Sequence, residues 1–87
     1  MTLQQLEYII AVDECRHFAR AAEQCRVTQP TLSAMIQKLE DELGARIFDR
    51  NRQPIAPSAV GELVIKQARE TLRQSKTIQE VVFEEKA

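Results

Sequence analysis

Short side chains that can both donate and accept hydrogen bonds gather over residues 28–38. In chain order these are Thr28, Gln29, Thr31, Ser33 and Gln37, with Pro30 and the small Ala34 between them. The first charge in the stretch is Lys38, and no acid precedes it. Side chains of this kind at the start of a helix can reach base edges in the major groove of DNA. The stretch therefore predicts a nucleic-acid recognition element, provided that it is helical and keeps one face exposed.

The same stretch carries the signals of an amphipathic helix over residues 28–43. Thr28 is a good N-cap residue, because its hydroxyl can accept an otherwise unpaired amide of the first turn. Pro30 is tolerated there, since the helix does not need its missing N–H. Apolar residues four, three and four apart indicate one buried face, formed by Leu32, Ile36, Leu39 and Leu43. Gly44 supplies the stop.

A shorter helix is predicted directly before it, over residues 18–25. Phe18, Ala21, Ala22 and Cys25 share one face of this helix, and the alanines allow another helix to approach closely. Only two residues then lead to Thr28, so the two helices match the helix-turn-helix pattern. On spacing alone, a small helical hairpin without DNA binding is the alternative.

An N-terminal helix is predicted ahead of this pair. Thr2 and Gln5 fit a capping box at its start. Its apolar residues form one face, and the helix ends near residue 14. We expect Glu7 and Tyr8 on its solvent side.

A small β-wing is predicted after Gly44. Residues 47–50 and 53–56 are short extended candidates around a polar turn, and Pro54 confines the second strand to an edge. Arg50 and Arg52 are candidates to touch the DNA backbone or minor groove. The alternatives are a solvated loop arginine for Arg52 and an ion pair of Arg50 with Glu40 or Asp41.

A long last helix is predicted over residues 58–84, with Ser58 as its N-cap. It would extend roughly 39 Å at 1.5 Å per residue. Its apolar positions are Val60, Leu63, Val64, Ala68, Leu72, Ile78 and Val82. A helix of that length cannot bury this stripe on a small core, so the surplus predicts a homodimer through residues 58–84. The alternative is a frayed end beyond about Thr77.

Composition limits the class of protein. A chain of 87 residues fits one domain with a small core. Its net charge of −1 argues against nucleic acid, yet residues 16–52 hold seven basic and five acidic residues. No membrane-length apolar run or secretion leader is present, which favours a cytoplasmic protein. One histidine, two cysteines without metal-ligand spacing and no glycine-rich phosphate loop predict no enzyme, no metal and no cofactor.

Residues 18–50 strongly resemble the N-terminal domain of LysR-type transcriptional regulators. The matching residues are Phe18 with Ala21-Ala22, then Val27 to Ser33, then Ile36, Leu39-Glu40 and Leu43-Gly44, and finally Phe48 and Arg50. The resemblance implies a mainly α winged helix-turn-helix domain at residues 1–57, with three helices and a two-stranded wing. It implies a linker helix for dimerisation at residues 58–87. Within the family, segments such as Arg16-His17-Phe18 and Gln29 to Ser33 are most similar to the peroxide-responsive activators.

The resemblance also implies roles for individual residues. Positions that meet base edges are Gln29, Pro30, Thr31, Ser33 and Ala34. Positions that hold the DNA backbone are His17, Arg20, Thr28, Gln37 and Lys38, and wing positions are Arg50, Arg52 and Gln53. Gln29 leads the first group, because a carboxamide can bond adenine bidentately. Ala34 departs from the family, where a longer polar residue is frequent, so fewer bases would be read.

The expected function is sequence-specific binding of double-stranded DNA at inverted repeats, in an oxidative-stress regulator. The partners implied are a second copy, a tetramer in the full-length protein, and RNA polymerase. Family members carry a sensing domain after the linker helix, so Cys15 and Cys25 are not expected to be the sensor; Cys25 is predicted to be a core thiol. The alternatives are a LysR-type regulator of a small-molecule effector and a helical interaction module without DNA binding.

Overall fold

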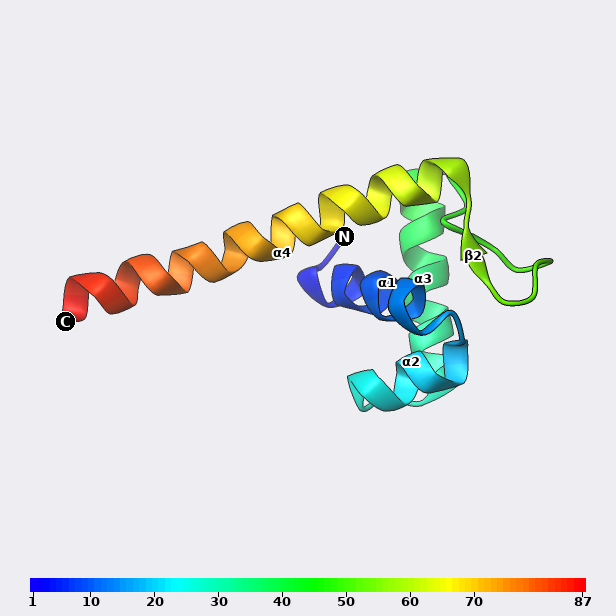
Figure 1. Ribbon diagram of the computed structural model, residues 1–87, viewed down its shortest axis with the longest axis horizontal. Coiled ribbons are helices and arrows are strands. Elements are labelled where there is room, and N and C mark those ends of the chain that lie inside the picture. Colours follow the sequence, from blue (N-terminus) through cyan, green and yellow to red (C-terminus); the bar gives the residue numbers. More distant parts are fainter.

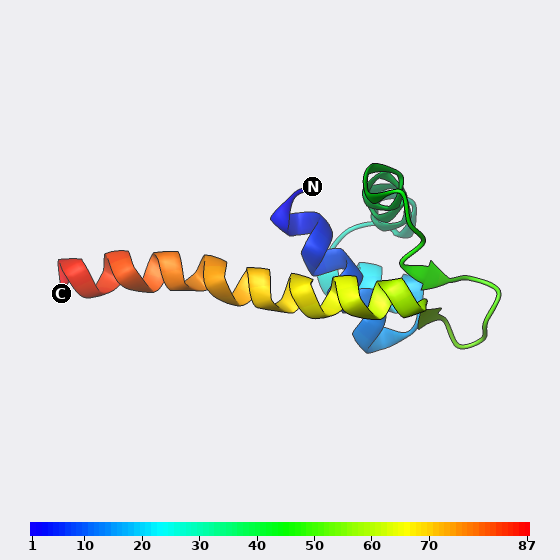
Figure 2. The ribbon, with the colours of Figure 1, turned by 90° about the horizontal axis from the view of Figure 1, so that it is seen from above.

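The computed structural model describes all 87 residues (Figure 1). Its elements are α1 (Leu3–Cys15), α2 (Phe18–Cys25), α3 (Gln29–Leu43), β1 (Phe48–Asp49), β2 (Ala56–Pro57) and α4 (Ala59–Lys86). The first three helices form a compact body, the wing loop projects from one end, and α4 runs far out on the opposite side (Figures 1 and 2). The predicted winged helix-turn-helix followed by a long helix is confirmed.

Every helix begins at a residue whose side chain caps it. The amide of the residue three positions on donates to the Thr2 hydroxyl, the His17 Nδ1, the Thr28 hydroxyl or the Ser58 hydroxyl. The first three helices each end at a residue with positive φ, which are Arg16 (54°), Arg26 (60°) and Gly44 (68°). The predicted caps Thr2, Thr28, Ser58 and Gly44 are therefore confirmed, since helix ends depend on signals within a few residues.

The aliphatic core lies where α1 meets α2, α3 and α4. Leu32, Ile36 and Leu39 are fully buried, as predicted, but Leu43 is 41% exposed because the last turn of α3 has passed the edge of the core. Tyr8 is 4% exposed, so its predicted position toward solvent is wrong. The reason is that α1 is central, and residues outside its main apolar stripe are covered by the helices around it.

The wing is shorter than predicted and has a different register. Phe48 lies opposite Pro57 and Asp49 opposite Ala56 in an antiparallel pair, joined by the loop of residues 50–55. Pro54, predicted to lie in the second strand, is in the loop, and the proline of β2 is Pro57. A proline is tolerated there because both strands of a two-stranded sheet are edge strands.

The first half of α4 packs against the core, and the last turns of the helix are fully exposed. Ile65 and Ala68 are buried, Val64 and Leu72 are partly buried, and every residue from Ile78 onward is exposed. The helix continues to Lys86 without fraying. The core thus extends past residue 57, the boundary that the sequence predicts.

None of the helices combines the length and the apolarity that crossing a membrane requires.

Candidate nucleic-acid interface

The start of α3 is an exposed helix end with unused hydrogen-bonding capacity. Gln29, Pro30, Thr31 and Ala34 are exposed, and Ser33 is partly buried. The Gln29 side chain forms no hydrogen bond within the chain, whereas the Thr31 hydroxyl accepts one from the Thr28 hydroxyl at 2.9 Å. The first turn holds no acid, so the positive end of the helix dipole is not neutralised. The arrangement suits base edges and phosphates.

Thr28 is committed to the helix start. Its hydroxyl oxygen accepts the Thr31 amide at 3.3 Å while its proton goes to the Thr31 hydroxyl. The hydroxyl can therefore only accept one more hydrogen bond, and a phosphate group of DNA has no proton to donate. The structure therefore gives the Thr28 side chain a capping role, which differs from the predicted phosphate contact.

Basic groups flank this helix start on two elements. His17 caps α2 by accepting the Arg20 amide on Nδ1 at 3.3 Å, which leaves Nε2 as an outward donor. The Arg20 guanidinium and the Lys38 ammonium are exposed and make no ion pair. Thr31, Ala34 and Lys38 follow one another at steps of three and four residues, so they lie on one face of α3.

Gln37 does not share this arrangement. Its side chain is partly buried and donates from Nε2 to the Asp41 carboxylate at 3.0 Å. The side chain is thereby turned toward the acidic end of α3, away from the exposed start, so its predicted backbone contact has no support in this geometry.

Arg50 is exposed, but its guanidinium is engaged by other side chains of the chain. Its guanidinium donates to the Glu40 carboxylate at 3.3 Å and lies 5.1 Å from the centre of the Phe18 ring. Of the two alternatives that the sequence left open, the structure shows the ion pair with Glu40. Arg52 and Gln53 are exposed in the wing loop and have no hydrogen-bond partner in the chain, so of the three predicted wing residues these two are free to contact DNA.

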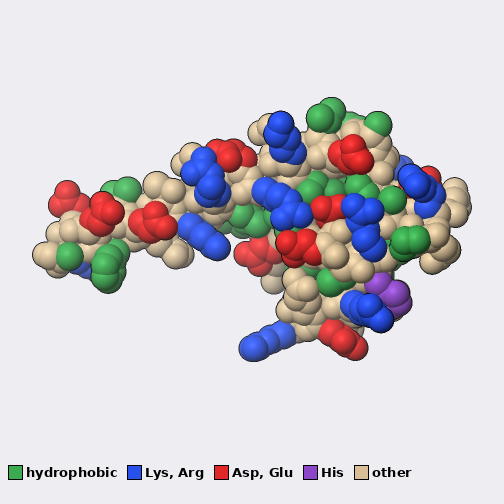
Figure 3. All heavy atoms as spheres, in the orientation of Figure 1, with side chains coloured by type: hydrophobic (Ala, Val, Ile, Leu, Met, Phe, Trp, Pro, Cys, Tyr) green, Lys and Arg blue, Asp and Glu red, His purple; other side chains and the backbone are tan.

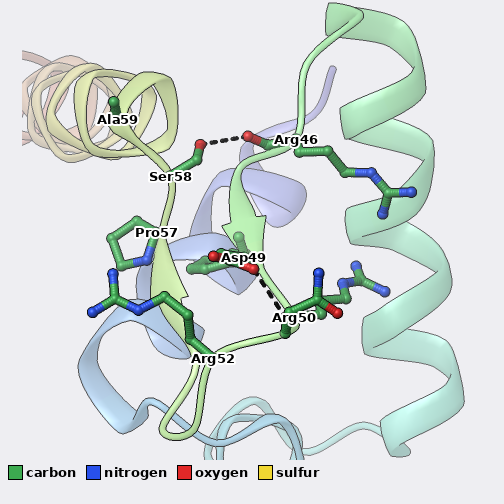
Figure 4. Close-up of a pocket in the computed structure, with 9 residues that line it drawn as sticks. Arg46, Asp49, Arg50, Arg52, Pro57, Ser58 and Ala59 are labelled. Carbon is green, nitrogen blue, oxygen red and sulfur yellow. Dashed lines mark hydrogen bonds between the residues drawn. The ribbon is translucent and has the colours of Figure 1, made fainter.

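Arg46 is a basic residue that the sequence analysis did not select. It is exposed, and with Arg50 and Arg52 it lines a surface hollow of about 610 Å³ between the wing and the start of α4. Figure 4 shows Arg46 and Arg50 reaching toward α3, whereas Arg52 lies near Pro57 on the other side. The sequence signal for Arg46 was its place between the end of α3 and the wing, but only the folded chain shows that it lines the same hollow as Arg50 and Arg52.

The three acids at the end of α3 do not act as one group. Only Glu40 faces the wing; Asp41 accepts from Gln37, and Glu42 pairs with the Met1 ammonium at 2.6 Å. The three acids have different partners because side chains at successive helical positions point in different directions. Figure 3 views the molecule from the side on which α1 lies in front of α3, and there basic and acidic side chains are interspersed.

The two cysteines are partly buried thiols. Cys15 donates to the Gln24 carboxamide oxygen at 3.2 Å, and Cys25 packs against the core without being fully enclosed. Burial, and then the nearby Glu7 carboxylate and Cys15, raise the pKa of the Cys25 thiol. A raised pKa disfavours the reactive thiolate, which is the opposite of what a redox sensor needs.

Three packed helices, a two-stranded wing and an exposed start of the third helix define a winged helix-turn-helix of the DNA-binding class. The family model described as "Bacterial regulatory helix-turn-helix protein, lysR family" matches residues 3–62. The chain therefore belongs to the LysR family, and it is a DNA-binding domain of a transcriptional regulator, not an enzyme.

Curated relatives share this domain along almost the whole chain. The "Hydrogen peroxide-inducible genes activator" of Pectobacterium carotovorum and the "DNA-binding transcriptional dual regulator OxyR" of Escherichia coli are each 44% identical over 85 residues. Those residues are 98% of this chain and 28% of each relative, so the chain spans little more than a quarter of their length. The "SDS degradation transcriptional activation protein" of a Pseudomonas strain is 41% identical over 80 residues, or 92% of this chain and 26% of that protein.

Solved structures agree with the fold. A full-length OxyR variant from Pseudomonas aeruginosa superposes with a TM-score of 0.89 at 46% identity, covering 94% of this chain and 28% of that one. The DNA-binding domain of BenM, solved in complex with its benA site 1 DNA, superposes with a TM-score of 0.93 at 31% identity, covering 97% and 94%. A homologous domain of nearly the same extent therefore binds DNA.

Proposed function

We propose that the chain is the DNA-reading part of a peroxide-responsive regulator similar to OxyR. The observation that carries the proposal is the exposed start of α3, with an unpaired Gln29 carboxamide, in a chain 44% identical to OxyR over 85 residues. The second candidate is a LysR-type regulator of another signal, which the 41% identity to the SDS degradation activator favours. Membership of the LysR family sets aside an interaction module without DNA binding.

In this proposal, base edges are read by the first two turns of α3. Gln29 bonds a base directly, while Pro30, Thr31, Ser33 and Ala34 offer smaller contacts to the groove. Phosphates are held by Lys38, Arg20 and His17, and Arg52 and Gln53 reach DNA from the wing. Since phosphate contacts position a protein and base contacts specify the sequence, the two sets predict different losses when they are removed.

The first test is Gln29→Ala on a duplex selected from a random pool. We expect a loss of roughly 1–3 kcal/mol on the selected site and little change on random DNA. Gln4→Ala is the matched control, because Gln4 is an exposed glutamine of α1 outside the predicted interface. Equal weakening on both kinds of DNA would show that Gln29 only positions the helix.

The second test is Lys38→Ala, measured over a range of salt concentrations. Loss of one phosphate contact should weaken binding on both kinds of DNA. It should also reduce the magnitude of the slope of log K against log salt concentration by about one. A loss limited to the selected site would contradict the phosphate role.

We further propose that the chain pairs with a second copy through α4. Val60, Leu63, Ile78 and Val82 are exposed on this helix, as are Val81 and Phe83. Leu63 also borders an apolar hollow of about 280 Å³ beside Met1 and Leu43. Ala68, predicted for the same interface, is only 2% exposed because it belongs to the chain's own core; Val64 and Leu72 are partly covered in the same way. Sedimentation as a monomer at high micromolar concentration would contradict dimerisation.

The remaining proposals concern the longer protein. A dimer would place two recognition helices about one DNA turn apart on an inverted repeat. A sensing domain after α4 would respond to peroxide. The longer protein would assemble as a tetramer and contact RNA polymerase. Such a regulator works where the chromosome lies, which agrees with the expected cytoplasmic location. The test is peroxide treatment of cells carrying the longer gene, followed by measurement of transcripts from promoters that this domain selects.

A further inference from the structure

Glu40 is the one charged residue of the chain that is buried, with 3% of its surface exposed. A buried carboxylate costs several kcal/mol unless it is paired and hydrogen-bonded. It lies in the last turn of α3, about three helical turns beyond Gln29. The proposed function does not use it, so its placement needs a separate explanation.

The carboxylate is satisfied entirely by the segment that leads into the wing. Oε2 accepts the backbone amides of Ile47 at 2.8 Å and Phe48 at 3.4 Å, and Oε1 accepts the Arg50 guanidinium. All three donors lie before or within the first half of the wing. One side chain of the recognition helix thus fixes the start of β1.

The same cluster reaches the start of α2. The Arg50 guanidinium lies over the Phe18 ring, and that ring packs edge-on against Phe48 with ring centres 6.2 Å apart. Phe18 is the first residue of α2 and follows His17, which caps that helix. Glu40 therefore connects the elements that carry all the proposed DNA contacts.

We propose that Glu40 is a positioning residue for DNA recognition, which holds the wing at the place where Arg52 and Gln53 meet DNA that α3 is reading. This inference rests on the proposed function. Without the carboxylate, two backbone amides and a guanidinium lose their shared acceptor, and the wing is free to shift relative to α3. Contacts made by the wing should be lost, while contacts made by Gln29 should persist.

The test is a pair of double-mutant cycles on DNA affinity, because coupling between two sites appears as non-additivity. Glu40→Gln keeps the size of the side chain and removes its charge. We expect it to weaken binding roughly tenfold alone, but less than about twofold when Arg52→Ala has already removed the wing contact. In the Gln29→Ala background its full effect should remain.

Amide hydrogen exchange separates this role from general destabilisation. In Glu40→Gln the amides of Ile47 and Phe48 have only a neutral carboxamide oxygen as acceptor, which is weaker than a carboxylate, so they should exchange faster; the Ile36 amide in the middle of α3 should be unchanged. All affinities are measured well below the melting temperature of each variant. If Glu40→Gln does not fold, Arg50→Gln takes its place in both cycles, since it leaves the two amide bonds intact and removes only the partly exposed partner.

Additive losses of Glu40→Gln and Arg52→Ala would overturn the inference, as would an Arg52→Ala variant that binds DNA normally. A Gln29→Ala variant that binds normally would instead contradict the proposed base reading. The two failures are therefore distinguishable.

Discussion

The two ends of α3 use their polar groups in opposite ways. At the start, Gln29 has no partner within the chain and its neighbours are exposed; at the end, the Glu40 carboxylate is buried and fully bonded. One helix therefore presents its first turns to a partner while its last turns hold the wing. Hydrogen-bonding capacity is thus free at the end of the helix that is proposed to meet DNA and is used within the chain at the end that packs against the wing.

The largest effect is expected from a substitution in the buried middle of α3. Ile36→Ala should lower the free energy of unfolding by about 2–5 kcal/mol, because it leaves a cavity among fully buried neighbours. Leu43→Ala, a leucine that is 41% exposed on the same helix, should cost under about 1 kcal/mol. Urea titration of both variants measures the contrast, and equal losses would show that the last turn is packed as tightly as the middle.

The packing around the end of α3 can also be disturbed from α4, at Gly61, which lies against the segment leading into the wing. A Cβ added at Gly61 would lie 1.9 Å from the Ile47 carbonyl oxygen, a backbone atom that cannot move aside cheaply. We expect Gly61→Ala to cost about 3 kcal/mol by overpacking. Gly44→Ala is the control, since that position has open space but a φ of 68°, and it should cost about 1–2 kcal/mol through backbone strain alone. Thermal melting that ranks Gly44→Ala as the worse of the two would contradict this account.

The stability of the exposed start of α3 depends on its N-cap residue, Thr28. Thr28→Ala should lower stability by about 1 kcal/mol, because the Thr31 amide loses its acceptor. Thr28→Ser keeps the hydroxyl and should retain both the stability and the DNA affinity of the parent chain. Weaker DNA binding by Thr28→Ser at unchanged stability would show that the threonine methyl, and not the cap, matters to recognition.

The smallest expected effect lies in the turn that leads into the exposed start of α3. Arg26 adopts a φ of 60°, a conformation that glycine adopts without strain, and its side chain makes no hydrogen bond. Arg26→Gly should raise the unfolding free energy by about 0.5–1 kcal/mol. Arg16 has a similar φ of 54° but pairs with Asp13 at 3.1 Å, so Arg16→Gly should gain less. Chemical denaturation that shows a loss for Arg26→Gly would contradict the strain.

Much of the site was predictable because its signals are local. The cap at Thr28, the stop at Gly44 and the buried face of Leu32, Ile36 and Leu39 each depend on residues within one or two turns. The exposed set from Gln29 to Ala34 follows from that face, since it is what the buried stripe leaves outside. The same reasoning failed for Leu43 and Tyr8, whose burial depends on where neighbouring helices end.

Local signals along the chain are enough to predict the order of the helices, their caps and the polar face proposed to read DNA. Helix and wing packing determines that Arg50 pairs with Glu40, that Ala68 is buried in the core, and that Arg46 lines one hollow with Arg50 and Arg52. The two sets of features differ in the sequence separation of the residues that cause them. Periodicity and capping act over three or four residues, whereas the partner of a side chain ten positions away is chosen only when the elements pack.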